Sequence, residues 1–158
     1  MFKSFLGRAA VIAAMIVAAG LWAGSALAVS STGGEYNTLF AGLGAKGYDP
    51  VAYHTVGKPT AGSDKITHAW KGVTWRFASE DNKKHFVASP DKYAPQYGGF
   101  CAWGVANNKL FDIDPVNGWK IVDHKLYITF NADILKIWEK DVPGFEKKAV
   151  ANWPGLNK

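Results

Sequence analysis

The stretch Ile66–Phe77, which reads ITHAWKGVTWRF, predicts an antiparallel β-hairpin. Its two halves alternate between apolar and polar residues, as half-buried strands do, and the Lys71-Gly72 pair between them is typical of a two-residue turn. Such a turn pairs Trp70 with Val73, His68 with Trp75, and Ile66 with Phe77. Because strand side chains alternate strictly between two faces, His68 is expected on the apolar face of this hairpin.

A second hairpin is expected over Trp119–Phe130, with Asp123-His124 at its turn. Two-residue hairpin turns favour positive φ, which Asp and His tolerate better than most residues. The apolar face of this hairpin collects Trp119, Ile121, Leu126, Ile128 and Phe130.

Two other apolar segments are expected to be extended. Pro50 biases the residue before it away from helix, so Tyr48–Tyr53 predicts a turn that leads into a short strand. The segment Phe100–Trp103, which Gly104 ends, predicts another short strand.

Helices are predicted from capping residues and apolar spacing. Ser79 is a good N-cap for a helix that runs to Val87, with acids in its first turn and lysines later. Segments Asn131–Asp141 and Gly144–Trp153 each carry apolar residues along one helical stripe. The sequence therefore predicts a single α+β domain, in which a small antiparallel sheet of hairpins packs with about three helices.

The N-terminus has the pattern of a secretory signal peptide. Lys3 and Arg8 precede an apolar run over Ala9–Ala23, and Ser25–Ala28 forms an A-x-A cleavage pattern. The alternative is an uncleaved membrane anchor, which needs a run of about 20 residues. We expect cleavage after Ala28 and a periplasmic or secreted protein, with no membrane span in the mature chain. Residues 29–46 would then be a loosely held lead-in, residues 47–153 the domain and residues 154–158 a tail.

Charge and cysteine content narrow the possible functions. The chain has 18 Lys and Arg against 13 Asp and Glu, and two of the basic residues, Lys3 and Arg8, lie in the predicted signal peptide. The remaining excess is small and scattered, so we do not expect nucleic acid as a partner. Cys101 is the sole cysteine, which excludes an intramolecular disulfide.

Several stretches of the predicted domain resemble the YHS domain proteins of exported bacterial type. The resemblance covers residues 47–153 and rests on GYDPVAY at 47–53, WRFAS at 75–79 with Phe86 and Pro90, KYAPQYGGFCA at 92–102, and Trp119 with IVD at 121–123 and KLY at 125–127. The run PQYGGFCA is the most specific of these. The resemblance implies a small exported α+β domain.

Shorter members of that family, attached to heavy-metal transport proteins, carry cysteines that suit a soft metal ion. This sequence departs from their pattern at three positions. Ala52 and Ala78 stand at the first two cysteine positions and Asn82 at or near the third. A site made of several thiolates is therefore not expected, and a structural tetrahedral zinc centre is excluded.

Cys101 has three interpretations. It is a small buried core residue, a ligand to Cu(I) or another soft ion with a histidine partner, or a catalytic or redox thiol. His54, beside the family-like segment, is the better histidine candidate for such a metal, and His68 is a weaker one. His85 and His124 are interpreted as helix-surface and turn residues.

A pocket with a polar floor is a further hypothesis, and its alternative is a packed aromatic core. Its candidate residues are Tyr48, Asp49, Tyr53, Tyr97 and Trp103. The sequence holds no phosphate-binding glycine loop and no recognisable catalytic triad pattern. We therefore expect a non-enzymatic exported binding module, with copper or another soft metal ion as the leading ligand. The alternatives are a module for a small molecule or a protein partner, with Cys101 in the core, and a thiol-dependent enzyme.

Overall fold

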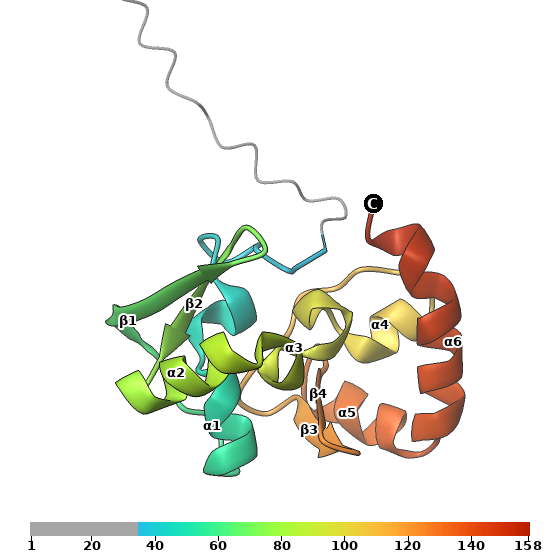
Figure 1. Ribbon diagram of the computed structural model, residues 1–158. Coiled ribbons are helices and arrows are strands. Elements are labelled where there is room, and N and C mark those ends of the chain that lie inside the picture. The colour runs from blue at the N-terminus through green and yellow to red at the C-terminus, as the bar shows by residue number, and fades with distance from the viewer. Residues whose placement is uncertain (1–34) are drawn as a thin grey trace, which may run out of the picture.

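The computed structural model describes residues 35–158, which form one mixed α+β domain (Figure 1). The predicted signal peptide, residues 1–28, lies outside the described residues. In chain order the elements are η1 (Gly44–Gly47), α1 (Pro50–Thr55), β1 (Ser63–Trp70), β2 (Val73–Phe77), α2 (Glu80–Ala88), α3 (Pro90–Tyr93), η2 (Gln96–Gly99), α4 (Ala102–Ala106), β3 (Trp119–Val122), β4 (Lys125–Ile128), α5 (Ala132–Glu139) and α6 (Val142–Leu156).

The α+β class predicted from the sequence is confirmed. Within the described residues the two hairpins form separate two-stranded antiparallel sheets, and six α-helices surround them. In Figure 1 the β1–β2 hairpin, α1 and α2 form one side of the molecule and α4, α5 and α6 the other, with α3 and the β3–β4 hairpin between them. Across residues 35–158, no helix combines the length and the apolar character needed to cross a membrane.

The β1–β2 hairpin has most of the predicted register. Trp70 lies opposite Val73 and His68 opposite Trp75, joined by a tight turn. The predicted pairing of Ile66 with Phe77 is wrong. An irregularity in β1 between Ser63 and Thr67 places Ser63 opposite Phe77 instead, as a β-bulge does by adding residues to one strand.

The β3–β4 hairpin also turns where the sequence predicts. Asp123 and His124 both have positive φ, at 48° and 62°. Phe130 was expected on the apolar face, but β4 ends at Ile128 and the Phe130 side chain is 51% exposed. Tyr127, from the opposite face of β4, is buried against Trp138 of α5, with ring centroids 4.9 Å apart. Both faces of β4 are therefore packed, which joins the two sides of the molecule.

The segment after Asp49 is helix α1 and not the expected strand. Asp49 itself is extended, as the following proline requires, with φ −72° and ψ 111°. Its carboxylate accepts hydrogen bonds from the backbone N–H groups of Val51 and Ala52, and Pro50 occupies the first helical position. An N-cap acid followed by proline is a helix start signal, so Asp49-Pro50 begins a helix here.

The predicted strand at Phe100–Trp103 is replaced by helix α4, which follows Cys101. The carbonyl of Cys101 accepts the first helical hydrogen bond, from Val105 N–H at 3.0 Å. Gly104 does not end the segment but lies inside the helix, where a Cβ atom would be 2.7 Å from the Phe111 ring. Glycine thus lets α4 lie close to the segment that follows it.

Parts of the lead-in segment are packed on the domain, at Tyr36, Asn37 and residues 43–46, whereas residues 39–42 are exposed. Asn37 is buried, and its backbone N–H donates to the Gly98 carbonyl at 2.8 Å. Tyr97, Gly98 and Gly99 all have positive φ, and a Cβ atom on Gly98 would overlap the carbonyl of Glu35. Glycine is needed at position 98 because the lead-in segment lies directly against it.

The core consists of three groups of buried side chains. The largest lies under the β1–β2 hairpin, where Phe86 of α2 contacts Trp75 and Phe77, each with ring centroids 5.2 Å apart. A second group joins α4 to α6 around Val105 and Ala149, and a third contains Tyr127 and Trp138. These aromatic contacts add to the burial of apolar area.

Substitution of Asp49 tests whether its buried carboxylate stabilises this fold. Besides capping α1, it accepts hydrogen bonds from Ala78 N–H at 2.8 Å and from the Asn82 side-chain amide at 2.6 Å. Asp49→Ala leaves these donors without an acceptor, so we expect the free energy of unfolding to fall by about 3 kcal/mol in urea titrations. Asp64→Ala, on an exposed position of β1, should change it by less than about 0.5 kcal/mol. Equal effects of the two substitutions would contradict this role.

Candidate functional site

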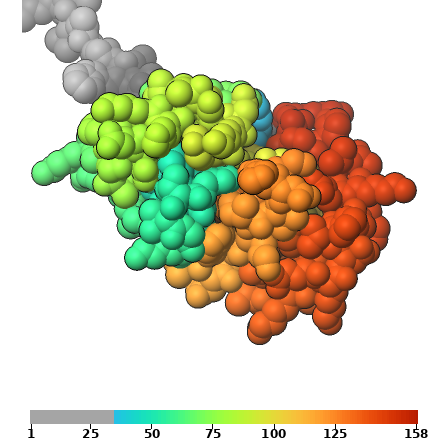
Figure 2. Space-filling model, turned by 60° about the horizontal axis from the view of Figure 1, so that its bottom comes forward, coloured from blue at the N-terminus to red at the C-terminus, as the bar shows by residue number. Residues whose placement is uncertain are grey.

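A pocket of about 540 Å³ lies between α1, α3 and the β3–β4 hairpin, and we call it the hairpin pocket. Figure 2 shows these three segments meeting on one face of the molecule, α1 in teal, the hairpin in orange and the α2–α3 region in yellow-green. Its lining residues are Tyr53, His54, Thr55, Gly57, Lys92, Tyr93, Trp119, Lys120, Ile121 and His124.

Aromatic side chains with fixed positions form the inner wall of the hairpin pocket. Tyr53 is buried, and its hydroxyl donates to the Pro115 carbonyl at 2.7 Å. The Tyr53 ring meets the Trp119 ring edge to face, with centroids 5.0 Å apart. Tyr93 meets the His54 ring in the same way at 5.4 Å. Because these rings hold one another, the wall keeps its shape without a ligand.

The charged groups of the hairpin pocket are basic. Lys92, Lys120 and His124 line it, and no Asp or Glu is among the lining residues. Lys120 forms an ion pair with Glu139, with its ammonium 2.5 Å from the carboxylate. In the described part of the chain no carboxylate forms an ion pair with Lys92, whose ammonium lies 5.0 Å from the centroid of the Tyr93 ring.

His54 is the most unusual polar group of the pocket. Its Nε2 atom is buried and has no hydrogen-bond partner in the structure. Burial lowers the pKa of His54 below its ordinary value, and the positive charges of Lys92 and His124 lower that pKa further. The imidazole is thus held neutral at pH 7, with one ring nitrogen unsatisfied. Leaving a buried polar atom unsatisfied costs free energy, so such an atom calls for an explanation.

Cys101 lies elsewhere, in the core. Its side chain is fully buried, and the backbone N–H of Phe130 donates to its sulfur at 3.2 Å. Burial raises the pKa of the thiol, and N–H groups of Gly104, Phe130 and Trp103 offset part of that rise. These surroundings fit a structural thiol.

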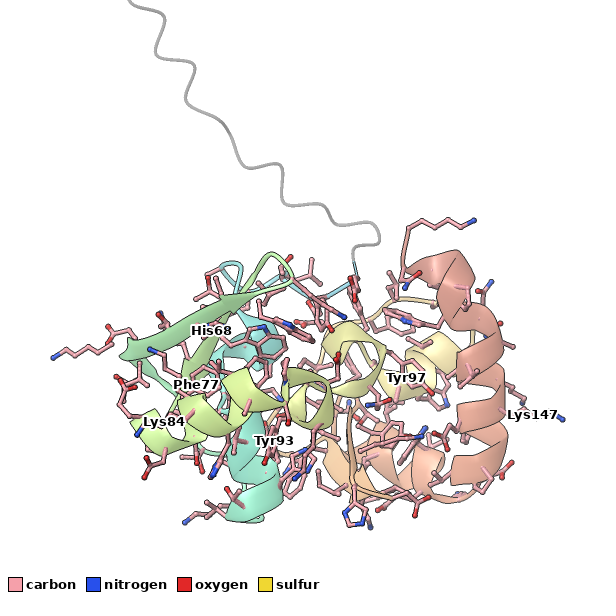
Figure 3. The ribbon with its side chains drawn as sticks, in the orientation of Figure 1. His68, Phe77, Lys84, Tyr93, Tyr97 and Lys147 are labelled. Carbon is pink, nitrogen blue, oxygen red and sulfur yellow. The ribbon has the colours of Figure 1, made fainter. Side chains whose placement is uncertain are left out.

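The three candidate metal ligands are not brought together. His68 packs against Phe86 in the first core group, with ring centroids 6.4 Å apart, whereas His54 lines the hairpin pocket and Cys101 does not. Figure 3 shows His68 beside β1, apart from Tyr93, which lies toward α1 and the β3–β4 hairpin. Over residues 35–158 no group of three or more His, Cys, Asp or Glu side chains is arranged to hold a metal ion.

The five residues expected to share one pocket lie in different places. Tyr53 lines the hairpin pocket, whereas the Asp49 carboxylate is buried in the hydrogen bonds described above. Tyr48 packs against the first core group. Tyr97 borders a smaller recess of about 150 Å³, and Trp103 an apolar groove of about 240 Å³ with Phe111 and Phe130. For Tyr48 and Asp49, the alternative of a packed interior describes the structure better.

Sequence reasoning missed most of the pocket lining, including Lys92, Tyr93, Trp119 and Lys120. These residues come from segments far apart in the chain, and no local spacing connects them. His124 is a turn residue, as expected, and it also lines the pocket. Tyr53 and His54 are the two lining residues that the sequence analysis named as functional candidates.

Comparison with known proteins adds no further assignment. No protein-family model matches the sequence, and no curated protein or solved structure matches it either.

The environment of Cys101 predicts a slowly reacting thiol. We expect Ellman's reagent to label native protein far more slowly than protein unfolded in guanidinium, because the thiol is buried and its pKa is raised. Cys101→Ser should lower the free energy of unfolding by about 1–3 kcal/mol, since it buries a hydroxyl in an apolar site. Labelling of native protein at the rate of a free cysteine would contradict a core role.

Proposed function

We propose that this protein is a small exported binding module that holds a small organic molecule in the hairpin pocket. The observation that carries the proposal is the pocket itself, a preformed space of about 540 Å³ with an aromatic wall and an unsatisfied buried nitrogen on His54. Sites for small molecules typically have volumes of roughly 300–1,000 Å³ and combine apolar walls with a few polar groups. The export part of the proposal rests on the N-terminal sequence and on the resemblance to exported YHS domain proteins.

Binding accounts for the pocket better than catalysis does. No Ser, Cys or carboxylate is among the lining residues, and the hydroxyl of Thr55 donates to the Val51 carbonyl at 3.1 Å. The Tyr53 hydroxyl is likewise engaged, with Pro115. A nucleophile with an adjacent base is the usual requirement for covalent hydrolytic or transfer chemistry. The buried thiol of Cys101 is also unsuited to a thiol-dependent reaction.

A pocket-filling substitution tests the proposal. We expect 1-naphthamide, a neutral aromatic probe, to shift the ¹H–¹⁵N signals of His54, Trp119 and Ile121 in NMR titrations. Thr55→Trp, at an exposed position on the pocket rim, should weaken this binding at least tenfold because the new indole occupies the space.

Lys147→Trp is the matched control, since Lys147 lies on α6 at the far side of the molecule (Figure 3). It should leave the affinity for 1-naphthamide unchanged. Signal shifts that spread over the whole domain, or that survive in Thr55→Trp, would show that the hairpin pocket is not the binding site.

A soft metal ion such as copper is the second candidate ligand. One observation favours it, namely that two histidines, His54 and His124, line the same pocket. Neutral imidazoles are good ligands for copper, and the lowered pKa of His54 keeps its ring neutral. In this form of the hypothesis Cys101 is not a ligand.

Titration with Cu(I) under reducing conditions separates the possible ligands. If copper binds in the hairpin pocket, His54→Ala and His124→Ala should each lower the affinity at least tenfold, while Cys101→Ala should leave it unchanged. An affinity that falls in Cys101→Ala alone would instead restore the thiol as the metal ligand. Tight binding that survives all three substitutions would remove both sites from consideration.

A further inference from the structure

We infer that the ligand of the hairpin pocket is an aromatic organic acid, with its flat apolar part against Trp119 and Tyr93 and its carboxylate paired with the ammonium of Lys92. This inference rests on the proposed function, because it names the chemical class of the molecule that the same pocket would hold.

The charge of the pocket favours an anion. Its lining includes the two lysines Lys92 and Lys120 and no carboxylate. Acidic residues do occur nearby, but their carboxylates pair with other groups. Glu139 pairs with Lys120 at 2.5 Å, and Asp91, the neighbour of Lys92 in α3, lies 3.7 Å from the ammonium of Lys71. Clefts lined by one sign of charge attract ligands of the opposite sign.

Lys92 is the cation best placed to meet that anion. Among the described residues it has no ion-pair partner, and its ammonium lies over the Tyr93 ring at 5.0 Å from the centroid. The aromatic ring positions the lysine side chain at the edge of the pocket. An ammonium in this position can pair with a carboxylate without first breaking another ion pair. By contrast, Lys120 would have to leave Glu139.

His54 borders the same part of the pocket without serving as the partner of the carboxylate. Its ring lines the pocket and lies edge to face with Tyr93, with centroids 5.4 Å apart. Its Nε2 atom is buried and has no partner among residues 35–158, so it does not open into the pocket. The ammonium of Lys92 is therefore the group that the ligand carboxylate meets.

The apolar side chains that line the pocket favour a flat aromatic ring in the part of the ligand that carries no charge. Trp119 is fixed by its contact with Tyr53, and Ile121 extends the same wall along β3. A rigid aromatic wall suits a flat ring system, since stacked and edge-to-face ring contacts are favourable. An inorganic anion would meet Lys92 but would leave most of the space of about 540 Å³ unfilled.

The test compares two probes of nearly the same shape, 1-naphthoate and 1-naphthamide, which differ in charge. Dissociation constants are measured by NMR titration of the full-length mature domain at pH 7 and low ionic strength. We expect naphthoate to bind about tenfold more tightly than naphthamide, and this preference to shrink as salt is added, because salt screens exposed charges.

Lys92→Gln should abolish most of the preference for naphthoate without changing the affinity for naphthamide. Lys147→Gln, an exposed lysine on α6, is the matched control and should keep the full preference.

Each outcome bears on a different claim. Equal affinities for the two probes would overturn the inference of an acidic ligand and leave the binding module standing. A preference for naphthoate that persists in Lys92→Gln would overturn the assignment of the carboxylate to Lys92. The absence of binding by either probe would count against the proposed function itself.

Discussion

The buried carboxylate of Asp49 is the interaction on which the position of the site depends. It accepts four hydrogen bonds, two from the start of α1 and two from the β2–α2 junction. Burial of a carboxylate is unfavourable unless hydrogen bonds compensate it, and here both oxygens are used. These four hydrogen bonds fix the start of α1 relative to the first hairpin. Because α1 is short and begins at Asp49, this residue sets the direction in which Tyr53 and His54 point.

The contacts of Tyr53 with the second hairpin explain why a pocket remains beside α1. The Tyr53 hydroxyl is tied to the Pro115 carbonyl, and its ring contacts Trp119 at the start of β3. These contacts bring the buried side of α1 against the hairpin. The last turn of α1 is not covered in the same way, since Gly57, with φ 70°, redirects the chain after it. His54 therefore lies on the border between packed core and open space, with one nitrogen buried and no protein group to meet it.

The sequence predicted the elements that have strong local signals, and it failed where two signals conflicted. Both hairpin turns and the helix capped by Ser79 follow from short patterns. The start of α1 was missed because proline disfavours helix for the residue before it, yet is favoured as the first helical residue itself. Helix α4 was missed because its sequence is a short run of apolar residues, and such a run lacks the alternation of apolar and polar residues that distinguishes a strand from a helix. Of the pocket, the sequence pointed only to Tyr53 and His54, since residues near positions 54, 92 and 120 meet only through the tertiary fold.

The Asp49 network also bears on the resemblance to shorter metal-associated YHS domains. The three positions where that comparison places cysteines are occupied here by Ala52, Ala78 and Asn82. Each of these residues donates a hydrogen bond to the Asp49 carboxylate, the first two through backbone N–H groups and Asn82 through its side-chain amide. The region at which the resemblance would place a cluster of thiolates is thus a network around a carboxylate in this protein.

This arrangement explains why Cys101 stands alone. A thiolate site needs several sulfur ligands close together and free to lose their protons. In this chain Asn82 is engaged in supporting α1, and the remaining thiol is buried, with a raised pKa and a backbone N–H directed at its sulfur. The one buried side-chain polar atom without a partner in residues 35–158 is Nε2 of His54, toward the far end of α1, and the His54 residue lines the hairpin pocket. The same helix thus links a satisfied structural carboxylate at its start to the candidate binding site at its end.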